Sequence, residues 1–285
     1  MTSTNNLISL VMPVYNGAEL ISETINSIIS QSYPYWELII VNDKSTDNTL
    51  EIVNEYKDKD ERIKLIDLEE NCGGPAKPRN IGIENSKGNF IALIDADDIW
   101  HKNKLLECSN FTDFDIIYHK ERCFNKNIDD GKECPTRDVK EIGDLHKNML
   151  INGNIFSPSA IIIKKEILLG EKFNEAVEYH GVEDFDLWLR LAKTNNFNYK
   201  FINKILGYYR LHDGGISKNF KKHGQKERRL VKDHFSDYYL VSSPYMFFVK
   251  YKKLFRSLLV NIVRTVQYKQ KLDISFYFKE FLKCF

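Results

Sequence analysis

The sequence predicts an α/β fold in which a mostly parallel, doubly wound sheet is flanked by helices. Four apolar runs of strand length alternate with segments whose apolar residues recur at helical spacing. The runs cover residues 7–12, 36–41, 62–66 and 90–94, and the helical segments cover about 20–32, 47–56 and 76–85. Because the fourth run shows no alternation of apolar and polar residues, we expect it to be buried on both faces, as in a parallel sheet covered by helices.

The order of elements is looser after residue 100. We expect further strands at 115–118, 159–163, 197–201 and 205–209, and helices at 144–151 and 183–193. Asn203 and Lys204 separate the last two strands, and residues 124–138 have the composition of an exposed loop. The chain therefore divides into a domain at 1–217, with halves at about 1–100 and 101–217, and a tail at 218–285.

The charge of the chain is unevenly distributed. Its 42% hydrophobic and 28% charged residues are typical of a soluble globular protein, and the formal net charge is +1. Residues 218–285, however, contain sixteen Lys and Arg against five Asp and Glu, whereas residues 1–217 contain twenty-five against thirty-five. An acidic body with a basic tail indicates an anionic surface as a partner, and we expect a membrane rather than a nucleic acid.

The tail also has helical periodicity. Apolar pairs repeat every three to four residues between 254 and 263, among basic residues, and a second apolar segment covers 274–282. This pattern predicts two basic amphipathic helices that lie on an anionic membrane. The alternative is a helical hairpin packed on the domain at 1–217 or on a second copy of the chain, as in a homodimer.

The cysteines and the N-terminal segment indicate a cytoplasmic protein. The five cysteines are odd in number and show no C-x-x-C spacing, which fits reduced thiols better than a disulfide framework. We find no pattern of a signal peptide and no apolar run of 18 residues. With the basic tail, this predicts a peripheral protein on the inner face of the cytoplasmic membrane.

Three carboxylates follow the fourth apolar run. Asp95 and Asp97 can point the same way from an extended backbone, because side chains alternate along it, and Asp98 is adjacent. Ligands of open α/β sheets bind outside the carboxyl ends of the strands, and Mg²⁺ or Mn²⁺ prefers carboxylate and phosphate oxygens. The alternative is a solvated acidic turn, since a D-x-D pattern alone is weak evidence.

Other candidate residues follow neighbouring strands and a glycine-containing loop. Asp43 could accept a hydrogen bond from a nucleotide base, or it could cap the next helix. Lys77 and Arg79 begin a helix after Gly73 and Gly74, where they could bind a phosphate or Asp97, or form an ordinary surface cation pair.

The second half of the domain supplies acidic residues and a histidine. Glu183, Asp184 and Asp186 begin a helix, where the helix dipole favours acids regardless of function. Asp184 could be a general base for an incoming hydroxyl, and Asp186 is the one most expected to be structural. His212 could complete a metal site, although a lone histidine is more often a core or surface residue.

Several common signatures are absent from the sequence. No G-x-G-x-x-G follows the first apolar run, and no G-x-x-x-x-G-K-[ST] or HExxH occurs. If the protein binds a nucleotide, acidic residues and a metal must replace the usual glycine loop.

Taken together, these segments resemble the motif series of inverting family 2 glycosyltransferases with the GT-A fold. The matching segments are Pro13–Asn16, Val41–Asp47, Arg79–Gly82, Asp95–Trp100, Glu183–Asp184 and Tyr209–His212. The resemblance covers about residues 7–217, and six ordered motifs make it specific. Two departures lie at Lys44, where the family often has glycine, and at Lys77-Pro78, where a small residue is common.

The resemblance implies a nucleotide-diphospho-sugar donor, usually UDP-linked, and Mn²⁺ or Mg²⁺ as cofactor. It implies a base pocket of Pro13, Tyr15 and Asp43, nucleotide contacts from Arg79 and Asp95, further substrate contacts from Ala96 and Glu183, metal ligands Asp97 and His212, and Asp184 as the base. The acceptor would be a lipid-linked glycan in surface polysaccharide synthesis. Two alternatives remain: a sugar-phosphate nucleotidyltransferase, which would need a basic glycine-rich loop after the first strand, and a non-catalytic nucleotide-binding membrane scaffold.

Overall fold

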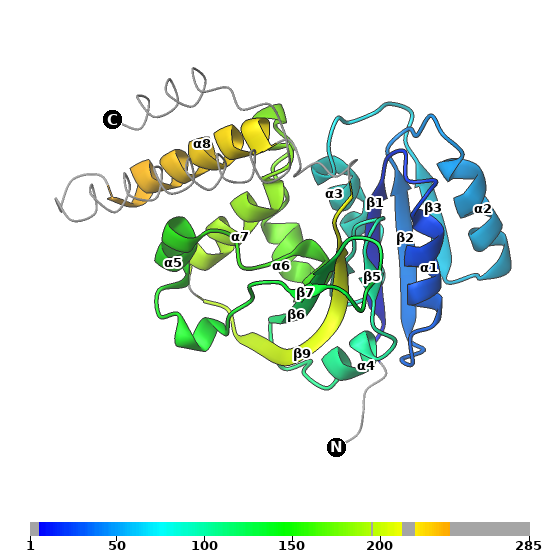
Figure 1. Ribbon diagram of the computed structural model, residues 1–285, viewed down its shortest axis with the longest axis horizontal. Helices are drawn as coiled ribbons and strands as arrows, with labels where there is room; N and C mark the ends of the chain where they lie inside the picture. Colours follow the sequence, from blue (N-terminus) through cyan, green and yellow to red (C-terminus); the bar gives the residue numbers. More distant parts are fainter. Residues whose placement is uncertain (1–5, 195, 213–219, 240–285) are drawn as a thin grey trace.

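A computed structural model of the chain describes residues 6–194, 196–212 and 220–239, and these form a nine-stranded sheet with helices on both faces (Figure 1). The strand order is β3-β2-β1-β4-β8-β6-β9-β5, and β7 pairs with β6. The strands are β1 (Ile8–Val14), β2 (Trp36–Asn42), β3 (Ile63–Asp67), β4 (Phe90–Leu93), β5 (Ile99–Trp100), β6 (Ile116–Phe124), β7 (Lys132–Glu133), β8 (Ile161–Lys164) and β9 (Tyr199–Arg210).

The α-helices are α1 (Ile21–Ile29), α2 (Thr49–Lys59), α3 (Ala76–Glu84), α4 (Lys104–Ser109), α5 (Leu145–Asn152), α6 (Lys165–Gly170), α7 (Glu183–Thr194) and α8 (Phe220–Tyr239). Three short 3₁₀ helices are η1 (Val139–Glu141), η2 (Pro158–Ala160) and η3 (Val177–Tyr179). The expected α/β class is confirmed. The first half alternates strands and helices at the predicted places.

The first four strands form the parallel part of the sheet. β1 pairs in parallel with β2 and with β4, and β2 pairs in parallel with β3. Every residue of β1, β2 and β4 is buried, as the unbroken apolar runs predicted. The carboxyl ends of β1, β2 and β4 therefore meet at one edge of the sheet.

The second half of the sheet has mixed strand directions. β8 is antiparallel to both β4 and β6, whereas β6 and β9 are parallel. We expected two strands around Asn203 and Lys204, but β9 is one strand, and that prediction is wrong. His119 of β6 pairs with Ile202 and Lys120 pairs with Ile205, so Asn203 and Lys204 form a bulge inside the strand.

Two hydrophobic clusters cover the two faces of the sheet. One contains residues of α3, α5, α6, α7 and α8, and the other contains residues of α1, α2 and α4. Gly82 allows α3 to approach β1 closely, because a Cβ there would lie 2.5 Å from Val11 Cγ1. This approach fixes the position of Arg79, one turn earlier in the same helix.

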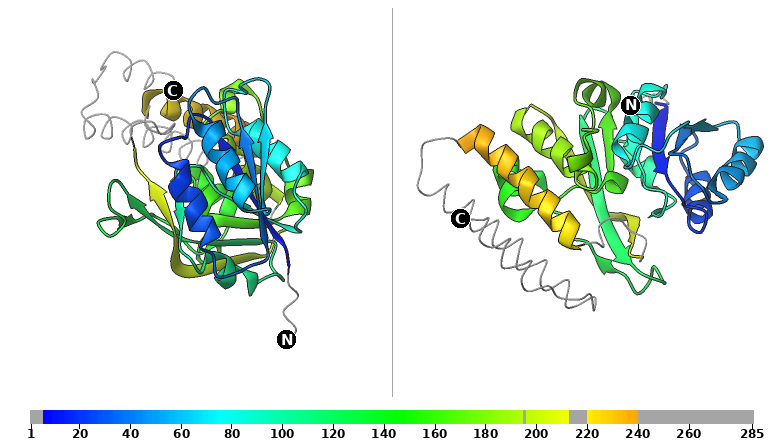
Figure 2. Two further views of the ribbon diagram at one scale, coloured as in Figure 1. Left: turned by 90° about the vertical axis from the view of Figure 1, so that its right-hand side faces the viewer. Right: turned by 90° about the horizontal axis from the view of Figure 1, so that it is seen from above.

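The described part of the tail packs on the domain. Leu230 and Val231 of α8 are each 1% exposed and belong to the cluster that contains α5 and α7. Figure 1 shows α8 on the side of the molecule away from α1 and α2, and Figure 2 shows it lying alongside the domain in two further views. The helices predicted at 254–263 and 274–282 lie outside the described residues. Within the described ranges, no helix is both long and apolar enough to cross a membrane.

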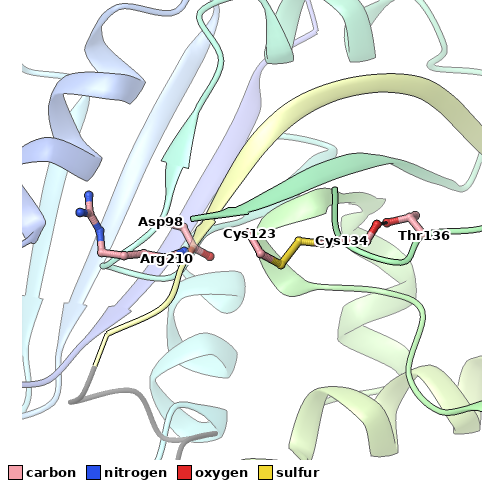
Figure 3. Close-up of a disulfide and its surroundings, with 5 residues drawn as sticks. All are labelled: Asp98, Cys123, Cys134, Thr136 and Arg210. Atoms are coloured by element: carbon pink, nitrogen blue, oxygen red, sulfur yellow. Dashed lines mark hydrogen bonds between the residues drawn. A yellow bond between two sulfur atoms is a disulfide. The ribbon is translucent and has the colours of Figure 1, made fainter. Parts of the chain in front are cut away.

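The expectation that all cysteines are reduced is wrong for two of them. Cys123 and Cys134 form a disulfide, with their Cα atoms 5.6 Å apart (Figure 3). β6 and β7 form an antiparallel pair in which Cys123 lies opposite Lys132, and this brings the two cysteines together across the strands. A spacing of eleven residues does not reveal that pairing. Cys72 and Cys108 are free thiols.

Candidate active site

The ends of β1 and β2 carry the residues expected to form a base pocket. Pro13 is buried and pairs with Val41, while Tyr15, just beyond β1, is 53% exposed. Asp43 is 4% exposed, and its Oδ1 accepts the Cys72 N–H at 2.7 Å. Asp43 therefore anchors the loop that follows β3 and does not cap α2. The ring of Tyr15 is available for stacking.

The backbone of the acidic loop after β4 is fixed from two directions. Asp95 N donates to Ser159 Oγ at 3.0 Å, and the Ala96 carbonyl accepts the Thr24 hydroxyl at 2.9 Å. Ser159 is itself buried, and its carbonyl accepts bonds from Trp100 Nε1 and Lys104 Nζ at 2.9 and 2.6 Å. The loop thus leaves the sheet in a defined direction, as a site for a diphosphate requires.

Arg79 connects the two halves of the domain. Its Nη2 donates to Asp95 at 2.6 Å and its Nη1 donates to Glu183 at 2.7 Å, and the residue is only 3% exposed. Burial opposes the charged form, but the Asp95 and Glu183 carboxylates raise the pKa of Arg79 above its ordinary value. The second oxygen of Glu183 accepts the Gly181 N–H at 2.6 Å. The described contacts of Glu183 are therefore internal, and they place α7 beside the end of β4.

Asp97 and His212 meet directly. Asp97 Oδ2 and His212 Nε2 are 2.8 Å apart, and both side chains are about one-third exposed, at 34% and 30%. Arg210 supports the pair, since its Nε donates to the Asp97 carbonyl at 2.9 Å and its backbone N–H donates to Asp98 at 2.9 Å (Figure 3). Burial, with Asp95 nearby, raises the pKa of Asp97, and the hydrogen bond from His212 opposes that shift.

Asp97 and His212 could supply two of the ligands of a divalent cation. Among the described residues, no three His, Cys, Asp or Glu side chains gather as a complete metal site. Magnesium-type sites, however, often use one or two protein ligands and complete the coordination shell with substrate phosphates and water. A carboxylate and an imidazole from different strand ends, both facing solvent, match that kind of site.

Asp184 lies at the start of α7, next to Glu183. Its Oδ2 accepts the Asn154 amide at 3.0 Å. Burial, with Glu183 beside it, raises the pKa of Asp184 to about 7, although Arg79 opposes the shift. Such a carboxylate can take a proton near neutral pH. Asp186, by contrast, bonds to Arg190 and His234, in agreement with a structural role.

The structure therefore brings the predicted residues together in three groups. Pro13, Tyr15 and Asp43 follow β1 and β2, the ion pairs of Arg79 join Asp95 to Glu183 with Asp184 adjacent, and Asp97 pairs with His212. Sequence reasoning missed the supporting residues Thr24, Ser159, Asn154 and Arg210. Only Arg210 lay in a quoted motif, and the other three carry no local signal.

An α/β domain with acidic residues at the carboxyl edge of its parallel strands, and with a histidine and a second acidic cluster joined to that edge, is suited to bind a ligand there. Residues 9–148 match the family model described as "Glycosyl transferase family 2". The chain is 32% identical to the teichuronic acid biosynthesis glycosyltransferase TuaG of Bacillus subtilis over 79% of the chain and 87% of TuaG. The chain belongs to glycosyltransferase family 2.

A second relative and a set of solved structures are also similar to the chain. The chain is 32% identical to the Escherichia coli UDP-Glc:alpha-D-GlcNAc-diphosphoundecaprenol beta-1,3-glucosyltransferase WfgD, over 75% of the chain and 80% of WfgD. The crystal structure of residues 1–349 of S. aureus TarS in complex with UDP matches 93% of the chain and 75% of that fragment (TM-score 0.63, 25% identity). The structure of the same fragment in complex with UDP-GlcNAc matches 97% of the chain and 79% of the fragment (TM-score 0.70, 24% identity). The expected GT-A fold is therefore confirmed.

Proposed function

We propose that this glycosyltransferase transfers a sugar from a UDP-linked donor to a hydroxyl group of a lipid-linked glycan, with inversion of the anomeric carbon. The observation that carries the proposal is the double ion pair of Arg79, which places the candidate base Asp184 beside the acidic loop after β4. The UDP-glucose and lipid-diphosphate acceptor in the name of WfgD, and the UDP bound by TarS, support the substrate classes.

Separate residues bind the donor and act on the acceptor hydroxyl. Tyr15 and Asp43 hold the base and Asp95 holds the nucleotide. Asp184 removes the proton of the acceptor hydroxyl as its oxygen attacks the anomeric carbon. A single displacement of this kind inverts that carbon, as in inverting hydrolases. Asp97 and His212 would hold Mg²⁺ or Mn²⁺, which supplies positive charge for the departing diphosphate.

Family membership argues against the two alternatives considered from the sequence. A sugar-phosphate nucleotidyltransferase would need a basic glycine-rich loop after β1, and residues 13–17 contain no Lys or Arg. A scaffold would not need Asp97, Asp184 and His212 together. We infer a site of action at the cytoplasmic membrane, because the acceptor in the name of WfgD is a sugar linked to a lipid diphosphate.

A panel of UDP-sugars tests this proposal. The wild-type protein should release UDP in a reaction that needs Mg²⁺ or Mn²⁺ and is stimulated by a membrane lipid extract. Asp97→Ala should lose metal-dependent donor binding in calorimetry. Asp184→Asn should still bind the donor but transfer sugar about 10² to 10⁴ times more slowly.

The exposed Asp58→Asn on α2 is the matched control and should behave as the wild type. Wild-type turnover by Asp184→Asn would reject the assignment of the base. Metal-independent donor binding would reject the assignment of Asp97.

A further inference from the structure

Asn154 lies where the candidate base needs a hydrogen-bond partner. Its Nδ2 donates to Asp184 Oδ2 at 3.0 Å, across thirty residues of sequence. One carboxylate oxygen of Asp184 is thus engaged by Asn154. An acceptor hydroxyl could then approach the other oxygen in a constant orientation.

The orientation of the Asn154 amide is itself determined. Its Oδ1 accepts the Phe156 N–H at 3.0 Å. A flipped amide would place an oxygen against the carboxylate of Asp184 and an NH₂ group against the N–H of Phe156, so the structure permits only one orientation.

The segment around Asn154 is built into the fold. Gly153 ends α5 with φ +99° and ψ −178°, a backbone conformation that is essentially restricted to glycine. Phe156 is 5% exposed, and its ring lies 6.0 Å from the ring of Trp188 on α7. Because Asp184 is on the same helix as Trp188, this contact couples the position of Asn154 to that of the carboxylate.

The charged groups around Asp184 explain why an uncharged amide, that of Asn154, suits its carboxylate better than a cation would. The charged groups that act on it are Glu183 on the same helix, Arg79 on α3 and Asp95 after β4, and the backbone N–H of Phe185 also donates to its carboxylate. The Nη atoms of Arg79 donate to Glu183 and Asp95. A cation bonded directly to Asp184 would lower its basicity, whereas an amide holds the carboxylate and stabilises its charged form only modestly.

We propose that Asn154 is a positioning residue that holds the carboxylate of Asp184 ready to accept the proton of the acceptor. This inference rests on the proposed role of Asp184 as the general base. Asn154 itself need not touch either substrate.

Three variants test the inference. Asn154→Ala removes the donor, and Asn154→Asp keeps the shape and the bond to Phe156 but replaces the donor with a carboxylate. Asn152→Ala, at the end of α5, is the matched control, since the exposed side chain of Asn152 donates to Asn148 Oδ1 in the same helix. UDP release from UDP-glucose and UDP-GlcNAc is the activity readout, and ¹³C NMR titration of labelled aspartates, assigned with Asp184→Asn, gives the pKa of Asp184 without turnover.

We expect Asn154→Ala to lower kcat about 10-fold and Asn154→Asp about 100-fold, with the KM for the donor unchanged. The pKa of Asp184 should rise by about one unit in Asn154→Ala, because the charged carboxylate loses a hydrogen-bond donor. The pH at which the rate falls on the acid side of the pH–rate profile should rise by the same amount. An unchanged pKa of Asp184 in both variants overturns the inference, as does an equal effect of Asn152→Ala. If Asp184→Asn retains activity, the proposed function itself fails. If Asp184→Asn is inactive while the Asn154 variants match the wild type, only the positioning role fails.

Discussion

At the scale of single residues, the environment of Asp184 makes a prediction about pH. Burial beside Glu183 raises the pKa of Asp184 to about 7, far above the ordinary value of 3.8. A general base works only in its ionised form, so the transfer rate should fall about 10-fold per unit as the pH drops below about 7. Initial rates between pH 5.5 and 8.5 at saturating donor check this. A rate that stays flat down to pH 5.5 would show that Asp184 is not the group that titrates.

A buried carboxylate in the sheet makes a second prediction, on stability. Glu37 Oε1 accepts Ser9 Oγ and Lys87 N, each at 2.6 Å, and Oε2 pairs with Lys64. Burial alone would raise the pKa of Glu37, but these hydrogen bonds outweigh it and lower the pKa below 4.5. A lowered pKa stabilises the fold at a pH above the unfolded value and loses that effect as the pH falls through the folded value.

Glu37→Gln should therefore lower the free energy of unfolding by about 1–3 kcal/mol at pH 7, and the difference should shrink below pH 4.5. Urea denaturation at pH 7 and pH 4 measures both quantities. The exposed Glu61→Gln, in the turn before β3, serves as the control and should change neither. A pH-independent difference would mean that the charge of Glu37 does not matter.

At the scale of elements, the β6–β7 hairpin is closed by the Cys123–Cys134 disulfide. Figure 3 shows this disulfide near Arg210. The pairing of β6 with β9 connects the disulfide to Arg210: Cys123 pairs with Tyr209, and Leu211 N donates to Phe124 O at 2.7 Å. The double variant Cys123→Ser/Cys134→Ser should have a free energy of unfolding about 2–4 kcal/mol lower than the wild type. Without the disulfide the unfolded chain has more conformational entropy, which favours unfolding.

Thermal unfolding with and without a reductant measures this effect, together with a count of free thiols under denaturing conditions. The double serine variant should be insensitive to the reductant, whereas the wild type should not. Three free thiols are expected in the oxidised protein if Cys284 is reduced, and five would show that the disulfide does not form. UDP binding should change little, because Asp43 bonds to the backbone of Cys72 and Asp95 pairs with Arg79, both outside the hairpin.

The elements also show what sequence alone could predict. Buried parallel strands leave apolar runs, and the residues that follow them must share one sheet edge, so Asp43, Asp95 and Asp97 could be placed from the sequence. The bulge at Asn203 and Lys204 could not be distinguished from a turn, because both need polar residues and only the register with β6 separates them. The Cys123–Cys134 pair and the bond from Asn154 to Asp184 likewise depend on tertiary contacts between separate elements.

At the scale of the whole molecule, α8 is part of the basic tail in the sequence but packs on the acidic domain in the structure. Leu230 and Val231 are buried against the domain, so α8 belongs structurally to the acidic body although its sequence lies in the basic tail. Lys226 Nζ donates to the carbonyls of Val177 and His180 at 3.2 and 2.6 Å, and the His180 ring contacts Gly74. The first tail helix is thereby linked to the loop after β3 that Asp43 anchors. The remaining excess of positive charge in the tail lies beyond residue 239.

Truncation after Ser242 keeps α8 and removes the segment with the predicted basic amphipathic helices. Residues 243–285 contain nine Lys and Arg residues but only two Asp and Glu residues. If that segment binds a membrane, the full chain should sediment with anionic vesicles, and the truncated protein should stay in the supernatant. Attraction between basic residues and anionic lipids is screened by salt, so 0.5 M NaCl should weaken sedimentation of the full chain, and neutral vesicles should retain less of it. Sugar transfer to a soluble acceptor should survive the truncation, since the described site residues and α8 are intact. Equal sedimentation of both proteins would place membrane binding, if any, in residues 1–242 and remove the tail from the mechanism.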